Sequence, residues 1–175
     1  MAGYGDYPFG LREVKVVSID GLTAVSLPAA QKLMFKETMI SDTLRGNDRK
    51  KSIVTIADGA EWSLEQGGIS LEAYAVMTGR TLVAAGTTPN QTNTLTVSAG
   101  DEFPYFKIYG KVVGDDAQAD VHVKIYKAKL SAAPEGTFED GKFYIQSCSG
   151  MAIDDDTNGI ADIVQNETAA ALPST

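Results

Sequence analysis

The sequence predicts a mainly β fold: an antiparallel β-sandwich or partial barrel with one short flanking helix and a long hairpin loop. Most segments alternate apolar and polar residues with a period of two, which is typical of strands that bury one face. Residues that favour turns separate these segments, and one segment has the capping residues of a helix. A length of 175 residues fits one domain with an ordinary core.

Strand signals begin near the N-terminus. Apolar residues over Val14–Val17 mark a first strand, and Asp20-Gly21 is a hairpin turn signal that leads into a second strand over 22–26. Pro28 ends that second strand. The expected division of the chain is an N-terminal arm over 1–10, a β domain over 11–168 and a C-terminal tail over 169–175.

The next two segments predict a hairpin with a long loop. Residues 31–41 are expected to pair with the β-branched run Ile53–Ile56, which leaves 42–51 as the connection. That connection exceeds the usual two to five residues, and it is basic within an otherwise acidic chain. Its composition fits a solvated, flexible tip as well as an arm that crosses to an acidic partner surface.

A short helix follows over 70–79. Ser70 is a suitable N-cap, Glu72 matches the positive first turn, and Gly79 can adopt the left-handed conformation that ends a helix. About two turns are marginal alone, so this helix must pack on the sheet. Further strands are expected over 81–85, 95–97, 103–113, 121–130 and 142–147.

Composition excludes several classes of function. The net charge of -8 opposes tight binding of nucleic acid, which requires Lys and Arg to neutralise phosphates. The only cysteine, Cys148, allows neither an internal disulfide nor a zinc site made of cysteines. The only histidine, His122, is expected on the polar face of a strand, so we expect no enzyme and no cofactor. The sequence also predicts no membrane span or secretory signal, and hence folding in the cytosol.

One segment has the oxygen-ligand spacing of a calcium loop. Its candidate ligands are Asp154, Asp156, Asn158 and Asp162, and a glycine permits the sharp turn. The position of the closing glutamate is Gln165, and the flanks read as strands instead of helices. The favoured interpretation is therefore a β-hairpin that turns at Asn158-Gly159, with calcium as the alternative.

Residues 30–80 hold a basic hairpin loop, a strand, an acidic Glu-x-Gly-Gly turn and a short helix that ends in Thr-Gly. These features are Leu44-Arg45-Gly46-Asn47-Asp48, Ile53–Ile56 and the run from Ala60 to Gly79. Together they resemble the major tail tube proteins of long-tailed bacteriophages with non-contractile tails.

The resemblance implies a structural virion protein of the tail, assembled in the host cytoplasm. Six subunits would form a ring, rings would stack into a tube, and strands would close an inner barrel through which DNA and the tape measure protein pass. The implied partners are further copies of this chain, the tape measure protein and the tail terminator and tip proteins, and DNA would pass without specific binding. The expected contacts between subunits are Leu44, Arg45, Arg49, Lys50 and Lys51 in the hairpin loop and Tyr4, Tyr7 and Phe9 in the N-terminal arm.

An acidic lumen wall would repel DNA at short range. Glu13 and Glu37, on the polar faces of the first strands, are the candidates for this wall. The alternative function is a monomeric or trimeric β-sandwich on a virion or cell surface that binds calcium or carbohydrate.

Overall fold

The computed structural model describes residues 7–114 and 119–174, and within them it confirms the mainly β class. Strands make up about 60% of these described residues, and most of them form a large antiparallel sheet that does not close into a barrel. The first elements are β1 (Pro8–Ser18), β2 (Ala24–Ser26), β3 (Ala30–Gly46), β4 (Arg49–Gly67), α1 (Leu71–Thr78) and β5 (Leu82–Ala85). The others are β6 (Thr92–Leu95), β7 (Phe106–Gly114), β8 (Asp120–Gly136), β9 (Ile145–Ala152) and β10 (Ala161–Asn166).

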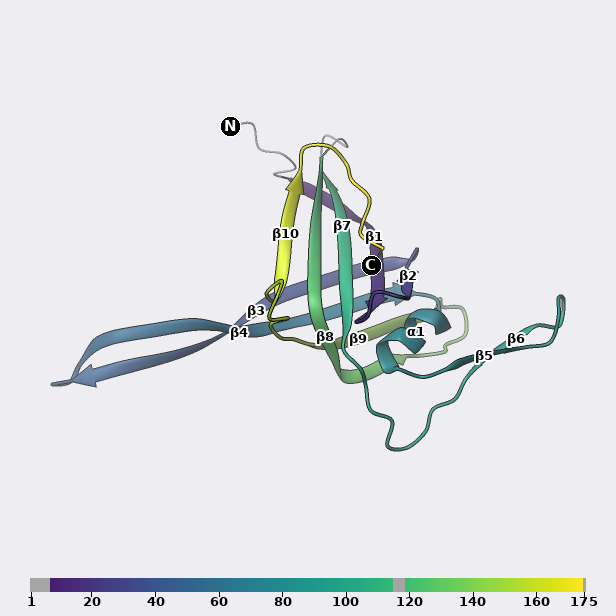
Figure 1. The fold of residues 1–175 in the computed structure, drawn as a ribbon, viewed down its shortest axis with the longest axis horizontal. Coiled ribbons are helices and arrows are strands. Elements are labelled where there is room, and N and C mark those ends of the chain that lie inside the picture. The colour runs from purple at the N-terminus through teal and green to yellow at the C-terminus, as the bar shows by residue number, and fades with distance from the viewer. Residues whose placement is uncertain (1–6, 115–118, 175) are drawn as a thin grey trace.

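The main sheet has the order β2-β1-β7-β8-β9-β4-β3, with β10 on β8 beside that path, and β5 and β6 form a separate hairpin. The strand β8 connects two parts of the sheet: residues 120–128 pair with β7, while β10 pairs with residues 120–125 and β9 with residues 128–136. The sheet therefore coils, so that β3 and β4 run across the direction of β7, β8 and β10 (Figure 1).

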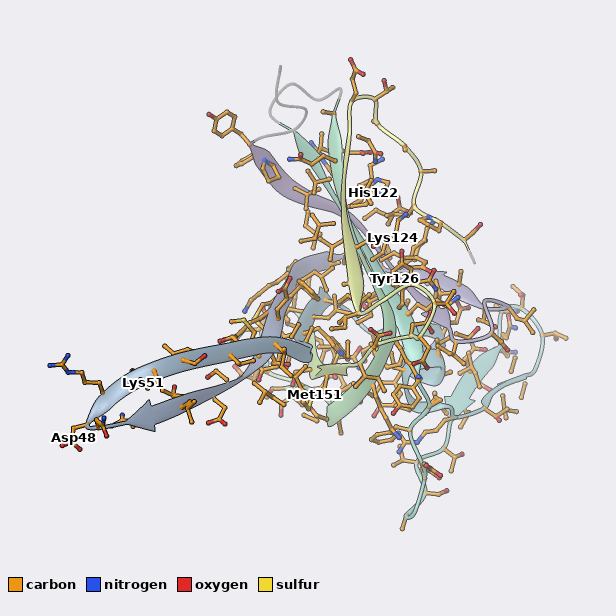
Figure 2. The ribbon with its side chains drawn as sticks, turned by 60° about the vertical axis from the view of Figure 1, so that its left-hand side comes forward. Asp48, Lys51, His122, Lys124, Tyr126 and Met151 are labelled. Atoms are coloured by element: carbon orange, nitrogen blue, oxygen red, sulfur yellow. The ribbon has the colours of Figure 1, made fainter. Side chains whose placement is uncertain are left out.

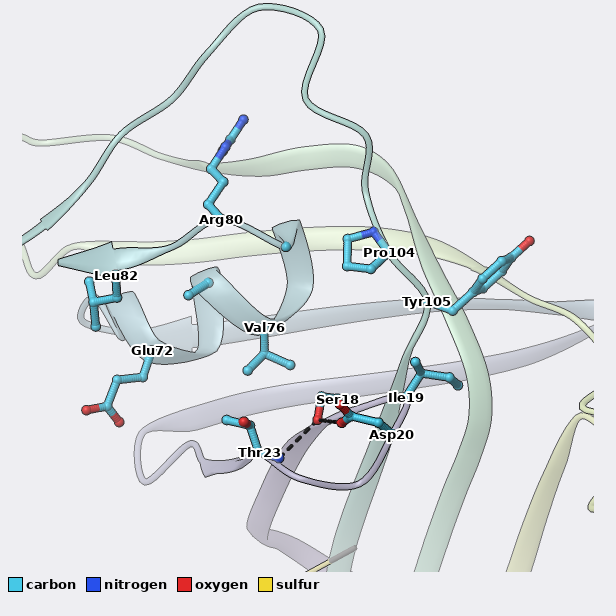
Figure 3. Close-up of a pocket in the computed structure, with 12 residues that line it drawn as sticks. Ser18, Ile19, Asp20, Thr23, Glu72, Val76, Arg80, Leu82, Pro104 and Tyr105 are labelled. Atoms are coloured by element: carbon cyan, nitrogen blue, oxygen red, sulfur yellow. Dashed lines mark hydrogen bonds between the residues drawn. The ribbon is translucent and has the colours of Figure 1, made fainter.

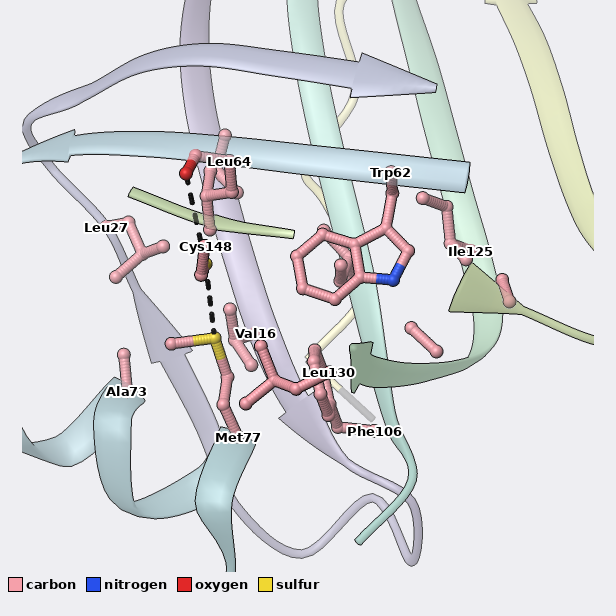
Figure 4. Close-up of a cluster of buried hydrophobic side chains, with 14 of the residues drawn as sticks. Val16, Leu27, Trp62, Leu64, Ala73, Met77, Phe106, Ile125, Leu130 and Cys148 are labelled. Atoms are coloured by element: carbon pink, nitrogen blue, oxygen red, sulfur yellow. Dashed lines mark hydrogen bonds between the residues drawn. The ribbon is translucent and has the colours of Figure 1, made fainter. Parts of the chain in front are cut away.

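The core lies between these crossing parts of the sheet and is closed by α1 (Figure 4). Trp62 and Phe106 are fully buried at its centre, with ring centroids 5.6 Å apart in an edge-to-face arrangement. The Trp62 indole N–H donates to the carbonyl of Met151 at 3.3 Å, which satisfies its one polar atom. Met77 of α1 fills the side of the core that faces the helix.

The predicted helix is confirmed together with both caps. The Ser70 hydroxyl accepts the Ala73 N–H at 3.3 Å, and Gly79 has a φ of 72°, the left-handed conformation that a glycine adopts without strain. The buried residues of the helix, Ala73, Met77 and Thr78, pack on the sheet, as expected for a helix of two turns.

The predicted long loop over 42–51 is wrong, because both strands of the hairpin continue through it. Asp42 pairs with Val54, and Gly46 pairs with Arg49 at the end of the ladder. Only Asn47 and Asp48 form the turn, and their φ values of 52° and 59° are those of a type I′ turn. Basic residues can occupy these strands because both faces of this part of the hairpin are open to solvent.

Several further strand boundaries differ from prediction: β6 covers Thr92–Leu95 instead of 95–97, and β9 covers Ile145–Ala152 instead of 142–147. The strand β1 begins earlier than expected, since Pro8–Gly10 of the predicted N-terminal arm already belong to it, and residues 1–6 lie outside the described residues. The predicted hairpin with a turn at Asn158-Gly159 is also wrong: β10 pairs with β8 instead of with the segment before it. The long strand β8 offers β10 a free edge over 120–125, and the intervening loop keeps one backbone bond, from Asp155 N–H to Gly159 O at 3.2 Å.

Candidate assembly surfaces

The hairpin β3–β4 extends far beyond the body of the protein. We call residues 39–57 the arm. It begins at a bulge between Thr38 and Met39, and β9 pairs with β4 only over 60–67. The arm is therefore a two-stranded ribbon that projects from the body, with Asp48 at its end (Figure 2). Such a ribbon is marginally stable in water without further packing.

One face of the arm is apolar. Alternation and register place four exposed side chains on this face: Ile40, Leu44, Val54 and Ile56, which are 54–66% exposed. Asp42 and Ser52 lie between them, and the opposite face carries Ser41, Thr43 and Thr55 together with two further exposed apolar side chains, Met39 and Ile53. A run of large apolar side chains on a projecting ribbon is typical of a surface that another chain covers.

The end of the arm is basic. Residues 44–51, which we call the basic tip, hold the four basic residues among the predicted contacts, Arg45, Arg49, Lys50 and Lys51, against one acid, Asp48. All of these side chains are exposed, and no ion pair within residues 7–114 and 119–174 involves the four cations. The tip therefore presents uncompensated positive charge on a chain of net charge -8.

The predicted contacts of the N-terminal arm fall in two regions. Tyr7 and Phe9, beside the start of β1, are 74% and 82% exposed, so both aromatic rings are available to a partner. Tyr4 lies outside the described residues.

The two lumen candidates lie on different faces of the sheet. Glu13 alternates with the buried Val14 and Val16, and it forms an ion pair with Lys15 at 3.4 Å. Glu37 is exposed and shares the face of β3 that carries Leu33 and Phe35, both packed against the core. The structure thus does not bring Glu13 and Glu37 together.

Two of the four predicted calcium ligands, Asp154 and Asp162, have a carboxylate oxygen that accepts a hydrogen bond. Asp154 accepts the backbone N–H of Asp156 at 2.6 Å, and the amide of Asn158 donates to Asp155 at 2.5 Å. Asp162 lies in β10, where the Tyr126 hydroxyl donates to it at 2.5 Å. In the part of the chain that the structure describes, no group of three or more His, Cys, Asp or Glu side chains is placed to hold a metal ion.

A buried polar cluster surrounds Asp120, and the sequence did not reveal it. The Asp120 carboxylate accepts hydrogen bonds from the Asn166 amide at 2.7 Å and the Ala170 N–H at 2.8 Å, and Lys111 Nζ lies 3.0 Å away. Burial disfavours its charge, but these donors outweigh burial and hold the pKa of Asp120 at about 2. His122 lies 3.2 Å from the same carboxylate and is buried, so its predicted place at the surface is wrong.

The Asp120 cluster fixes the C-terminal tail on the outer face of the sheet. Lys111 also donates to the Ala170 carbonyl at 2.5 Å, and Lys15 donates to the Leu172 carbonyl at 3.3 Å. The Leu172 side chain is buried against Val17 and Tyr109. Residues 169–174 are therefore a docked strap in the single chain.

Comparison with known proteins gives no relative: the chain matches no protein-family model and no curated protein sequence. The one helix among residues 7–114 and 119–174 has eight residues, too few to span a bilayer.

Proposed function

We propose that this chain is a structural subunit of a virion tail tube, which assembles into stacked six-membered rings. The observation that carries the proposal is the arm: a long two-stranded ribbon with an exposed apolar face and a basic tip. Burial of that face requires another molecule, because the ribbon projects away from its own body (Figure 2).

The resemblance of residues 30–80 to tail tube proteins supplies the kind of assembly. It makes further copies of this chain the main partners and the tape measure, terminator and tip proteins the others. A net charge of -8 suits a conduit for DNA, since like charges repel within a Debye length of about 8 Å at physiological salt. No catalytic or cofactor role enters this proposal.

The first test compares the full chain with a variant that lacks the arm. Ser41 and Thr55 pair across the ribbon, so residues 42–54 can be replaced by an Asn-Gly turn without changing the body. We expect the intact chain to sediment as large particles above a threshold concentration, whereas the shortened chain stays monomeric with unchanged thermal unfolding. Particles of equal size from both proteins would contradict the proposal.

The same measurement addresses the alternative function. A chain that stays monomeric at every concentration, and whose thermal stability rises with added calcium, would instead favour a surface binding module that uses Asp154, Asp156, Asn158 and Asp162.

A further inference from the structure

A groove lies between α1 and the turn that joins β1 to β2 (Figure 3). We call it the α1 groove; its volume is about 460 Å³, a size that accommodates several side chains. Its apolar wall comes from four segments, namely the β1–β2 turn, α1, β5 and the segment before β7, and its acidic mouth comes from the β1–β2 turn and the first turn of the helix. The wall is formed by Ile19, Val76, Leu82 and Pro104, and the two acids at the mouth are Asp20 and Glu72.

The negative charge at the mouth is fixed in place. The Asp20 carboxylate accepts the Ser18 hydroxyl and, at 3.0 Å, the Leu22 N–H. These hydrogen bonds hold the pKa of Asp20 below its ordinary value, so the carboxylate is ionised at neutral pH. Glu72 is exposed and adds a second charge. Arg80, which also lines the groove, is paired with Asp101 at 2.7 Å, so its charge is compensated.

The α1 groove and the arm are complementary in polarity and in charge. The groove offers an apolar wall beside two acids, and the arm offers an apolar face beside four bases. The arm leaves the body on the side away from α1, so it cannot reach the groove of its own chain (Figure 1). A second copy can bring the two surfaces together, and the resulting head-to-tail contact repeats from subunit to subunit.

We propose that the α1 groove is the acceptor for the arm of a second copy of this chain. The apolar face of the arm covers Ile19, Val76 and Leu82, while its basic tip lies against Asp20 and Glu72. This inference rests on the proposed function, to which it adds the surface on which each arm binds.

An exchange of charges between the basic tip and the groove tests whether the tip lies against Glu72 of a second copy. In the full chain, Arg49→Glu or Glu72→Arg alone should raise the threshold concentration for assembly by about three- to tenfold, because each places like charges together. An equimolar mixture of the two variants allows the Arg49→Glu arm to meet the Glu72→Arg groove, and it should restore part of the loss. Asp140→Arg is the matched control, an exposed acid in the β8–β9 connection, and should leave the threshold unchanged.

Cross-linking tests the position of the arm. In the double variant Ile19→Cys/Leu44→Cys, whose second position lies in the basic tip on the apolar face, a short bismaleimide should join neighbouring subunits into a ladder of oligomers on a denaturing gel. The native thiol does not interfere, since Cys148 is buried. The control pair Ile19→Cys/Ile163→Cys replaces an isoleucine of similar exposure in β10 and should give no ladder.

The outcomes separate this inference from the proposed function. Large particles that give no ladder and ignore the charge exchange would overturn the α1 groove as acceptor, while the tube proposal would stand. A chain that remains monomeric at all concentrations would overturn both.

Discussion

If assembly buries the apolar face of the arm, a substitution at Ile56 should raise the threshold concentration for assembly by a predictable factor. This side chain is 59% exposed in the single chain, and complete burial of an isoleucine contributes about 1.5–3 kcal/mol. Covering the exposed part on assembly therefore contributes about 1–2 kcal/mol per subunit. The substitution Ile56→Ser removes that contribution and should raise the threshold concentration about 5- to 30-fold, since 1.4 kcal/mol corresponds to a factor of ten.

Ultracentrifugal pelleting over a concentration series measures that threshold. The fold itself should be nearly unaffected, because Ile56 lies outside the core, and the free energy of unfolding should change by less than about 1 kcal/mol. The matched control is Ile163→Ser, which replaces a 64% exposed isoleucine in β10 and should leave the threshold unchanged. Equal thresholds for Ile56→Ser and the unaltered chain would refute the reasoning.

Three further predictions concern the body of the protein. The pKa of Asp120 is about 2 in the folded chain against an ordinary 3.8, so its contribution to the free energy of unfolding is complete above about pH 4 and is lost as the pH falls through 2. Urea unfolding should show Asp120→Asn to be less stable than the unaltered chain by about 2 kcal/mol at pH 7. If stability depended on acid pH equally in this variant and in the unaltered chain, a stabilising role of the Asp120 carboxylate would be excluded. A Cβ at Gly150 would lie 2.0 Å from the Lys129 carbonyl oxygen and 2.6 Å from the Trp62 ring, so Gly150→Ala should lower the free energy of unfolding by about 1–3 kcal/mol in the same assay. The control Gly46→Ala, whose Cβ would have its nearest neighbouring atom at 3.5 Å, should lower it by less. Burial raises the pKa of the Cys148 thiol to about 12, so a maleimide should label it only after unfolding; rapid labelling of the native chain, seen by mass spectrometry, would contradict its burial.

The features that the sequence predicts correctly are those with local signals. The helix was predictable because its N-cap, its acidic first turn and its terminal glycine all lie within ten residues, from Ser70 to Gly79. The alternation of apolar residues likewise predicts the strand class, since one face of most strands is buried.

The features that it misses depend on partners far along the chain. The Asp120 carboxylate accepts hydrogen bonds from Asn166 and Ala170, and no residue near Asp120 in the sequence indicates that these distant residues are its partners. His122 is buried in the same cluster, since it lies 3.2 Å from the Asp120 carboxylate that the backbone of Ala170 contacts. The length of the arm was missed because the turn at Asn47-Asp48 is a less familiar hairpin signal than Asn-Gly, and the basic residues around it are typical of a loop.

We propose that this chain builds a tube from copies of itself through the arm. Negative-stain electron microscopy of the purified chain above its threshold concentration tests it most directly. We expect hollow rings or stacked tubes of uniform diameter, which are absent when residues 42–54 are replaced by the short turn. Isolated particles of the size of one chain, or compact oligomers without a central channel, would contradict the claim.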